Sequence, residues 1–302
     1  MGKWWCLLLV TICWVAAGFA IFDIPPAQDT AAAARPEKIS RIISTAPNIT
    51  EILFTLGLED KIIGVTSDSI YPPEATKKLN IGNFWQPDIE AIIAAKPELV
   101  ITLGFPLYPQ QQNLADRLSR LGYNSLTVFN TEKVSDLFDA IEKIGAATKT
   151  QHQANMLMAE VRTKLDDITL LVKGMEKVRV LYVVQREPLR VAGRDTFINE
   201  LIELAGGENA IGPTIQKYPP IGSEQLIACN ADVIIEPTMG QKNSEQMQND
   251  AIQYWNRYKN ITAVRNKRIY IVDDDTISQL GPRLYEGVET IARCLKPEIF
   301  EN

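Results

Sequence analysis

Large aromatic side chains recur in segments that we predict to be loops at the ends of β-strands. A ring in such a loop is hard to bury in an ordinary core, and each ring offers about 150 to 250 Å² of flat apolar surface. Any one ring could instead seal the loop of its own domain, but the set as a whole favours binding of a large ligand. The set comprises Tyr71, Phe84, Trp85, Phe105, Tyr108 and Tyr218.

Arginines form a second group of candidate binding residues. Arg186, Arg190 and Arg194 follow an apolar run, and Arg283 follows a Gly-Pro pair. A guanidinium pairs with a carboxylate or phosphate through a planar fork of N–H donors. We therefore expect one or two of Arg186, Arg194 and Arg283 to face a ligand, although the run of three could also be a solvated hairpin.

Residues suited to catalysis are scarce. The chain has one histidine, His152, which polar neighbours place on a solvated surface, and metal ligands normally occur in clusters. Nucleophile elbows, Walker loops, zinc-protease motifs and dinucleotide-binding loops are missing from the sequence. Asp273, Asp274 and Asp275 are consecutive and should not all face one ion, so we predict a solvated loop there. The sequence predicts no enzyme, no catalytic cofactor and no metal bound directly by the protein.

Short β-branched runs alternate with helical segments in the first half of the chain, which predicts a parallel sheet. Ligands bind beyond the carboxyl ends of the strands in such sheets. Those ends hold Ala46-Pro47-Asn48, the segment from Ser67 to Tyr71, and Phe105, so we add Pro47 and Asn48 to the candidate ligand-binding residues. The predicted order is strand 41–44, helix 49–56, strand 62–65, helix 89–95, strand 99–103, helix 109–121, strand 125–129 and helix 134–147.

A single amphipathic helix is predicted over 150–175, because apolar residues recur there at spacings of three and four. At 1.5 Å per residue it would be about 39 Å long, enough to join two lobes. The apolar positions are Ala154, Leu157, Val161, Leu165, Ile168 and Val172.

A second series of strands and helices then repeats the order of the first. It predicts strand 179–184, helices 196–205 and 223–229, strand 233–236, helix 249–258, strand 268–272 and helix 282–294. The predicted fold class is therefore α/β, with two doubly wound parallel-sheet lobes joined by one long helix. The lobes span 39–149 and 176–302, the helix spans 150–175, and the two lobes look like a diverged pair.

The N-terminal segment 1–38 predicts export. Lys3 precedes an apolar run from Trp4 to Phe22, as in a secretory signal. The run is also just long enough to span a bilayer, so a cleaved signal peptide and a retained anchor both remain open. Neither Cys6 nor Cys13 follows the small residues of a lipoprotein signal, so we expect no lipid anchor and a periplasmic or other extracytoplasmic protein.

Charge and cysteine content exclude further classes. The net charge is −6 and no basic run occurs that could neutralise phosphates, which argues against a nucleic-acid partner. Only Cys229 and Cys294 lie beyond the N-terminal segment. They could form a disulfide in an oxidising compartment or remain two buried thiols, and spacing does not decide between these.

The chain carries a series of short sequence motifs whose order resembles that of the substrate-binding proteins of ATP-driven importers for cobalamin, haem and ferric siderophores. The two lobes of those proteins are joined by one long helix. The resemblance runs from about residue 40 to the last helix, and the order and spacing of the motifs are more specific than any one of them. They are RIISTAPNITEIL from Arg41, GVT from Gly64, YPPEA from Tyr71, DIE from Asp88, KPELV from Lys96, GRDTFI from Gly193, LAGGEN from Leu204, SEQL from Ser223 and GPR from Gly281.

The resemblance implies a cleft between the lobes that closes modestly, in a monomer. It also implies that Glu90 and Glu224 dock onto arginines of the permease of an ABC importer, which works with its ATPase. The Tyr71-Pro-Pro segment and the loop with Trp85 are most similar to cobalamin binders, so the ligand expected is a cobalt corrinoid. The arginines near Arg186 keep a ferric siderophore or haem open.

Two other classes compete with a transport receptor. An enzyme acting in the cleft would need a nucleophile and a base near the strand ends, and His152 lies on the connecting helix. A membrane-tethered sensor with the same fold would keep the segment from Trp4 to Phe22, which the mass of the exported protein would reveal.

Overall fold

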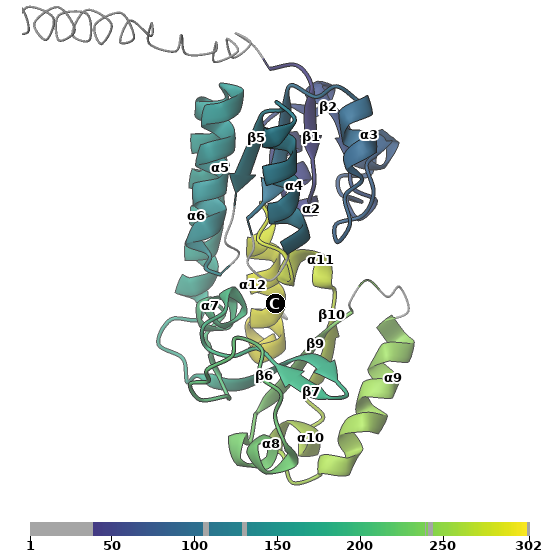
Figure 1. The fold of residues 1–302 in the computed structure, drawn as a ribbon. Helices are drawn as coiled ribbons and strands as arrows, with labels where there is room; N and C mark the ends of the chain where they lie inside the picture. Colours follow the sequence, from purple (N-terminus) through teal and green to yellow (C-terminus); the bar gives the residue numbers. More distant parts are fainter. Residues whose placement is uncertain (1–38, 105–108, 129–131, 239, 241–243, 301–302) are drawn as a thin grey trace, which may run out of the picture. The chain divides into compact units, whose positions relative to one another are not determined.

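The computed structural model describes residues 39–104, 109–128, 132–238, 240 and 244–300, and these form two sheets with helices around them (Figure 1). We call the part before the long connecting helix the N-lobe and the part after it the C-lobe. The predicted signal segment 1–38 lies outside the described residues.

The N-lobe sheet has five parallel strands in the order β3-β2-β1-β4-β5. Its central strand β1 is fully buried, as expected of a strand covered by helices on both faces. The strands are β1 (Ile42–Ser44), β2 (Ile62–Val65), β3 (Leu79–Asn80), β4 (Leu99–Leu103) and β5 (Ser125–Val128). The helices are α2 (Pro47–Thr55), α3 (Ile89–Ala94), α4 (Pro109–Arg120) and α5 (Ser135–Thr148), with short 3-10 turns at Glu59–Lys61 and Pro73–Lys77.

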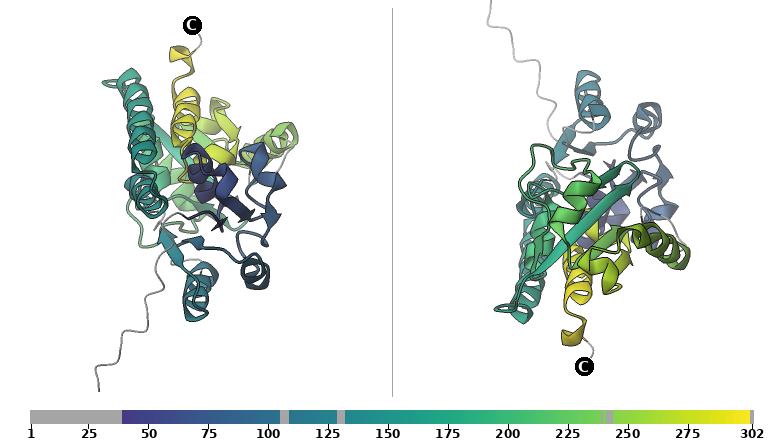
Figure 2. Two further views of the ribbon diagram at one scale, coloured as in Figure 1. Left: turned by 90° about the horizontal axis from the view of Figure 1, so that it is seen from above. Right: turned by 90° about the horizontal axis from the view of Figure 1, so that it is seen from below.

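The connecting helix α6 (Gln151–Leu171) buries every apolar position that the sequence pattern identified within it. It lies beside α5 and beside α12 of the C-lobe, as the views in Figures 1 and 2 agree. It is shorter than the predicted 150–175, at about 32 Å for 21 residues. The reason is Gly174, whose φ of +78° belongs to the left-handed region where helices commonly end.

The C-lobe sheet has the order β10-β9-β6-β7, and β8 pairs with β6 as well. All its pairings are parallel except that of β6 with β7. The strands are β6 (Val178–Arg186), β7 (Leu189–Val191), β8 (Gly207–Asn209), β9 (Val233–Pro237) and β10 (Ile269–Val272). The helices are α7 (Phe197–Leu204), α8 (Ser223–Cys229), α9 (Ser244–Trp255), α10 (Thr262–Arg265), α11 (Asp274–Ile277) and α12 (Leu284–Leu295), with 3-10 turns at Asn256–Tyr258 and Pro297–Ile299.

The parallel strands of the two lobes follow the same order. In the N-lobe sheet the spatial order of four neighbouring strands is β2-β1-β4-β5. In the C-lobe sheet the corresponding spatial order is β8-β6-β9-β10. The helices that lead into β4 and β9 are α3 and α8, so these occupy matching places in the two lobes. The arrangement agrees with the prediction of a diverged pair.

One hydrophobic cluster runs through both lobes and the connecting helix. It contains Ile42 and Ile52 of the N-lobe, Val161 of α6, and Val180 and Val288 of the C-lobe, all fully or nearly fully buried. Because apolar surface shared between the lobes would have to be exposed to separate them, this core opposes large rearrangement. The α/β prediction with two parallel-sheet lobes and one long helix is confirmed.

Three short strands were missed by the sequence analysis. They are β3, β7 and β8, each of two or three residues. The sequence left the arginine-rich segment open between residues that face a ligand and a solvated hairpin, and in the structure β6 and β7 form a hairpin with Arg190 opposite Gln185. Such short segments carry too few residues to show the alternation that identifies a strand.

Candidate ligand-binding site

A cavity of about 510 Å³ lies between the lobes, within the usual size range of small-molecule sites. Both lobes contribute to its walls. The lining residues are Pro47, Asn48, Asp68, Phe84, Trp85 and Leu103 of the N-lobe and Tyr182, Val184, Phe197, Ile198, Tyr218, Pro237, Asp274, Ser278, Gln279 and Leu280 of the C-lobe.

The carboxyl ends of strands from both sheets meet at this cavity. Pro47 follows β1, Asp68 follows β2, and Leu103 ends β4. In the C-lobe Pro237 ends β9 and Asp274 follows β10. The cavity thus occupies the position that parallel sheets commonly offer to ligands.

The aromatic loop of the N-lobe is fixed by its backbone. Gly82 has a φ of +92°, and a Cβ there would lie 2.6 Å from the carbonyl oxygen of Gln86, so the turn requires glycine. The Asp68 carboxylate accepts a 2.6 Å hydrogen bond from the Phe84 N–H. The Phe84 and Trp85 rings meet edge to face, with centroids 5.3 Å apart. This loop therefore presents two aromatic side chains to the cavity on a held backbone.

The C-lobe wall is mainly apolar but contains one buried phenol. Tyr182 is 2 % exposed, and burial raises the pKa of its hydroxyl well above the ordinary value, so the group stays a neutral phenol. Ser278 partly opposes this rise in pKa, although the Tyr182 hydroxyl has no hydrogen-bond partner among the described residues. No pattern in the sequence identified Tyr182 as a cavity residue, because it lies inside a largely buried strand.

The charged side chains among the described lining residues are both carboxylates. Asp68 comes from the N-lobe and Asp274 from the C-lobe. Asp274 Oδ1 accepts hydrogen bonds from the Thr238 hydroxyl at 2.5 Å and the Gly240 N–H at 3.0 Å. No lysine or arginine is among the described residues that line the cavity.

The aspartate run does not form the solvated loop that we predicted. Asp273 caps α11 by accepting a hydrogen bond from the Asp275 N–H at 3.1 Å, and Asp274 opens the helix. One carboxylate oxygen from each of the three lies within 4.8 Å of the others, closer than expected for consecutive residues. The helical turn is what folds them together. Burial raises the pKa of Asp275, helped by the charges of Asp273 and Asp274.

The three candidate arginines, Arg186, Arg194 and Arg283, do not line the cavity. Each of them contacts other groups of the protein. Arg186 pairs with the buried Glu236, with its Nη2 atom 2.7 Å from the carboxylate. Arg194 donates to the carbonyl oxygens of Ile211 and Asn209 at 3.0 and 3.3 Å.

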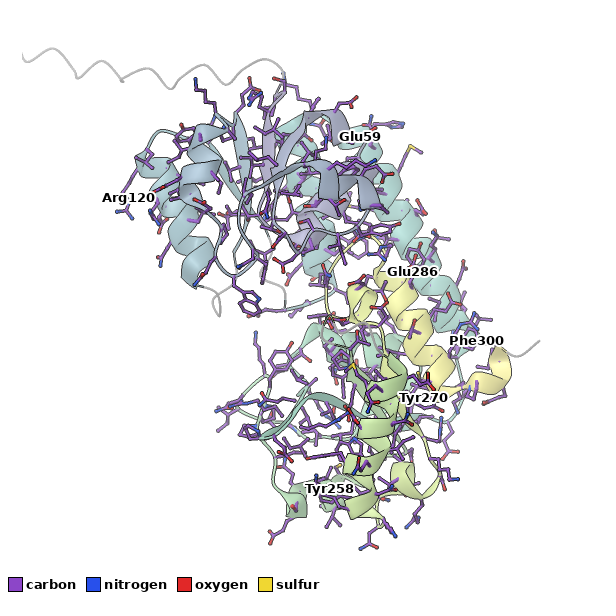
Figure 3. All side chains as sticks on the ribbon, turned by 90° about the vertical axis from the view of Figure 1, so that its right-hand side faces the viewer. Glu59, Arg120, Tyr258, Tyr270, Glu286 and Phe300 are labelled. Carbon is purple, nitrogen blue, oxygen red and sulfur yellow. The ribbon has the colours of Figure 1, made fainter. Side chains whose placement is uncertain are left out.

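Arg283 links the two lobes. Its guanidinium donates to the carboxylate of Glu51 on α2 and lies 3.6 Å from the centroid of the Tyr71 ring. A carboxylate oxygen of Glu286 of α12, labelled in Figure 3, lies 4.0 Å from the Nη1 atom of Arg283. Asn48 adds a second link by donating to the carbonyl oxygen of Leu280 at 3.2 Å. Arg283 and Tyr71 thus belong to a junction beside the cavity.

The predicted binding residues therefore divide into three groups. Those that line the cavity are Pro47, Asn48, Phe84, Trp85 and Tyr218. Those that the structure places elsewhere are Tyr71, Arg186, Arg194 and Arg283. Phe105, like Tyr108, lies outside the described residues. Asp68 and Asp274 also line the cavity. Neither was named as a binding residue from the sequence, although both lie in segments that follow strands, which is a signal that could have identified them.

The two glutamates predicted to dock onto a permease occupy matching helices. Glu90 is the second residue of α3 and Glu224 the second residue of α8, and both are exposed. The Asp88 carboxylate caps α3 by accepting hydrogen bonds from the N–H groups of Glu90 and Ala91 at 2.9 and 3.1 Å. Because another residue caps this helix, the Glu90 side chain is not needed for that purpose.

The histidine and the two cysteines of the described residues can also be compared with the predictions. His152 is exposed on α6, as predicted. Cys229 and Cys294 are both buried and unpaired, which is one of the two alternatives. Among the described helices, none combines the length and the apolar character that crossing a bilayer demands.

Comparison with known proteins agrees with this geometry. The family model described as periplasmic binding protein matches residues 42–276. An uncharacterized ABC transporter substrate-binding lipoprotein of Bacillus subtilis, YvrC, is 30% identical over 279 residues, which cover 91% of this chain and 85% of the relative.

Solved structures show the same fold. A possible iron-binding periplasmic solute-binding protein of Staphylococcus epidermidis superposes with a TM-score of 0.75 at 29% identity, covering 85% of this chain and 99% of that one. The vitamin B12-binding protein BtuF of Vibrio cholerae superposes with a TM-score of 0.73 at 25% identity, covering 87% and 99%. With two lobes, a connecting helix and a lined cavity between them, the chain belongs to the periplasmic binding protein family.

Proposed function

We propose that this protein is the substrate-binding component of an ABC importer and captures a cobalt corrinoid of the cobalamin type between its lobes. The observation that carries the proposal is the cavity wall, in which aromatic residues from both lobes face a space without a lysine or arginine among its described lining residues. A corrinoid has a broad apolar ring system edged with uncharged amides, which suits such a wall. The vitamin B12-binding relative supports the same ligand class.

A ferric siderophore or haem is the alternative ligand of the same importer class. The iron-binding relative favours it. The arginines that kept this alternative open in the sequence analysis are bound within the protein, Arg186 by Glu236 and Arg283 by Glu51. An anionic iron chelate would therefore meet no cation on the described cavity wall.

The remaining parts of the proposal follow from that role. The protein would act outside the cytoplasm as a monomer, without catalysis, and hand its ligand to a permease driven by an ATPase. His152, exposed on α6, is not among the described residues that line the cavity. Retention of the N-terminal segment in the exported protein, measured by mass, would instead support the tethered sensor.

Equilibrium binding decides the ligand. The purified protein without residues 1–38 is titrated with cyanocobalamin, haemin and a ferric siderophore, and heat is measured by calorimetry. We expect saturable one-to-one binding of cyanocobalamin and weaker binding of the other two. Absence of binding by all three would refute the proposed role, and preference for haemin or the siderophore would replace the corrinoid with that ligand.

Trp85 is the aromatic anchor that we expect to matter most for binding. Trp85 lines the cavity, and 58 % of its surface is exposed to solvent. A ligand can therefore cover this side chain without disturbing the core. Replacing it with alanine should weaken binding by about 1 to 3 kcal/mol, the range for a buried aromatic contact. Calorimetric titration measures the affinity, and thermal melting should show nearly unchanged stability.

Trp255 provides the matched control. It is fully buried in the C-lobe, outside the cavity, and its indole N–H donates to Glu236 at 2.5 Å. Trp255→Phe should lower the melting temperature without a specific loss of affinity in the folded protein. If Trp85→Ala instead melts early and keeps its affinity, Trp85 is a structural residue and the cavity wall is wrongly assigned.

A further inference from the structure

We propose that Asp68 and Asp274 form a charge filter, which admits ligands with an uncharged or cationic edge and rejects ligands that bring a carboxylate to the same place. The inference rests on the proposed function in one respect, that this cavity is where the ligand binds. It concerns which ligands are admitted, and it applies to corrinoid and porphyrin alike.

The two carboxylates are held from opposite lobes. Asp68 is fixed by the Phe84 N–H at 2.6 Å, and Asp274 Oδ1 by Thr238 and Gly240 at 2.5 and 3.0 Å. These bonds use only part of the acceptor capacity of each group, since a carboxylate has about four lone-pair sites. The remaining sites suit N–H donors, such as the primary amides at the edge of a corrinoid.

Surrounding charges strengthen the negative potential at the C-lobe side. Asp273 and Asp275 each place a carboxylate oxygen within 4.8 Å of those of the other two aspartates in the run. The described lining offers no cation to offset them. Arg283 attracts the Asp275 charge, but its guanidinium is already bound by Glu51. Among the described lining residues, a carboxylate on a ligand would therefore meet like charge without a compensating partner.

The expected penalty is measurable. Two like charges about 4 Å apart repel by about 1 kcal/mol in water and more where the surroundings are less polar, which corresponds to a loss of affinity of about 5- to 30-fold at a partly solvated site. Salt should reduce the penalty, because exposed charges are screened.

The test uses ligand pairs that differ in one charge. Cyanocobalamin is compared by calorimetry with its monocarboxylate derivatives, in each of which one peripheral amide is replaced by an acid. The protein is used as wild type and as Asp68→Asn/Asp274→Asn, in which the remaining carbonyl oxygens still accept the bonds from Phe84, Thr238 and Gly240. Asp166→Asn, on the exposed side of α6, is the control for net charge.

We expect at least one monocarboxylate to bind wild type and the Asp166 variant about 5- to 30-fold more weakly than cyanocobalamin, and the double variant to reduce that difference to about twofold or less. If every monocarboxylate binds wild type as tightly as cyanocobalamin, the filter does not exist, although the corrinoid function stands. A penalty that persists in the double variant would assign it to other groups and overturn the proposal.

Failure of the proposed function gives a separate result. If no corrinoid binds but haemin does, the comparison becomes haemin against its dimethyl ester, which has the same ring without ionisable carboxylates. Tighter binding of the ester by wild type, and loss of that preference in the double variant, would support the filter while the corrinoid is excluded. Equal binding of both would refute the filter as well.

Discussion

Replacing Arg283 with alanine should lower the free energy of unfolding by about 3 to 5 kcal/mol, the usual cost of leaving one partner of a buried ion pair alone. The Arg283 and Glu51 side chains are only 18 % and 7 % exposed, so the Glu51 carboxylate would lose its partner in a poorly hydrated position. The variant also loses the contact with the Tyr71 ring. Urea denaturation monitored by circular dichroism measures the effect.

The loss should depend on pH. Burial raises the pKa of Glu51 above its ordinary value of 4.5 even though the Arg283 hydrogen bond opposes the rise, so removing Arg283 should raise it further. An acid with a higher pKa in the folded state binds more protons when folded, and stability then falls as pH increases through that range. The deficit of Arg283→Ala relative to wild type should be largest near neutral pH and shrink as the pH falls toward 4.5.

Two controls separate this pair from ordinary surface charge. Arg293 pairs with Glu289 on the exposed side of α12, and Arg293→Ala should cost less than about 1 kcal/mol. Combining Glu51→Gln with Arg283→Met removes both charges and should recover much of the loss. A cost for Arg283→Ala no greater than that of Arg293→Ala would show that the link between the lobes adds little to stability.

Reversing the charge of both Glu90 and Glu224 should weaken association with the permease by about 2 to 5 kcal/mol, the range for charge pairs lost across an interface. The two residues occupy matching positions on α3 and α8, so a partner with two equivalent basic sites could engage both. Ligand affinity should not change, because neither residue lines the cavity. Co-purification with the permease and uptake of labelled ligand by cells are the measurements.

The alternative role of these glutamates is to stabilise the starts of their helices, which would be worth about 0.3 to 1 kcal/mol each. That role predicts a lower melting temperature with normal uptake. Reversal of Glu176 and Glu245, which are also exposed, changes the net charge by the same amount and serves as the control. Normal uptake by the Glu90/Glu224 variant would rule out docking through these residues.

The long elements could be predicted from the sequence because their signals are local. The bounds of β2, β4 and α8 match the predicted ranges, and the apolar spacing from Ala154 onward identified the buried face of α6. The end of α6 was placed too late because the effect of Gly174 on the helix was not weighed. The start of α9 was placed five residues too late, since its first turn is polar and shows no apolar periodicity.

The sequence by itself determined the fold class, the connecting helix and five residues of the cavity wall, because strand ends and loop aromatics are visible in the order of residues along the chain. The tertiary structure decided which charges are available to a ligand. Arg186 and Arg283 are bound by Glu236 and Glu51, which lie 50 and 232 positions away in the chain. A charge that is already paired across such distances cannot be distinguished from a free one until the chain is folded, so the sequence could not show that Arg186 and Arg283 pair within the protein.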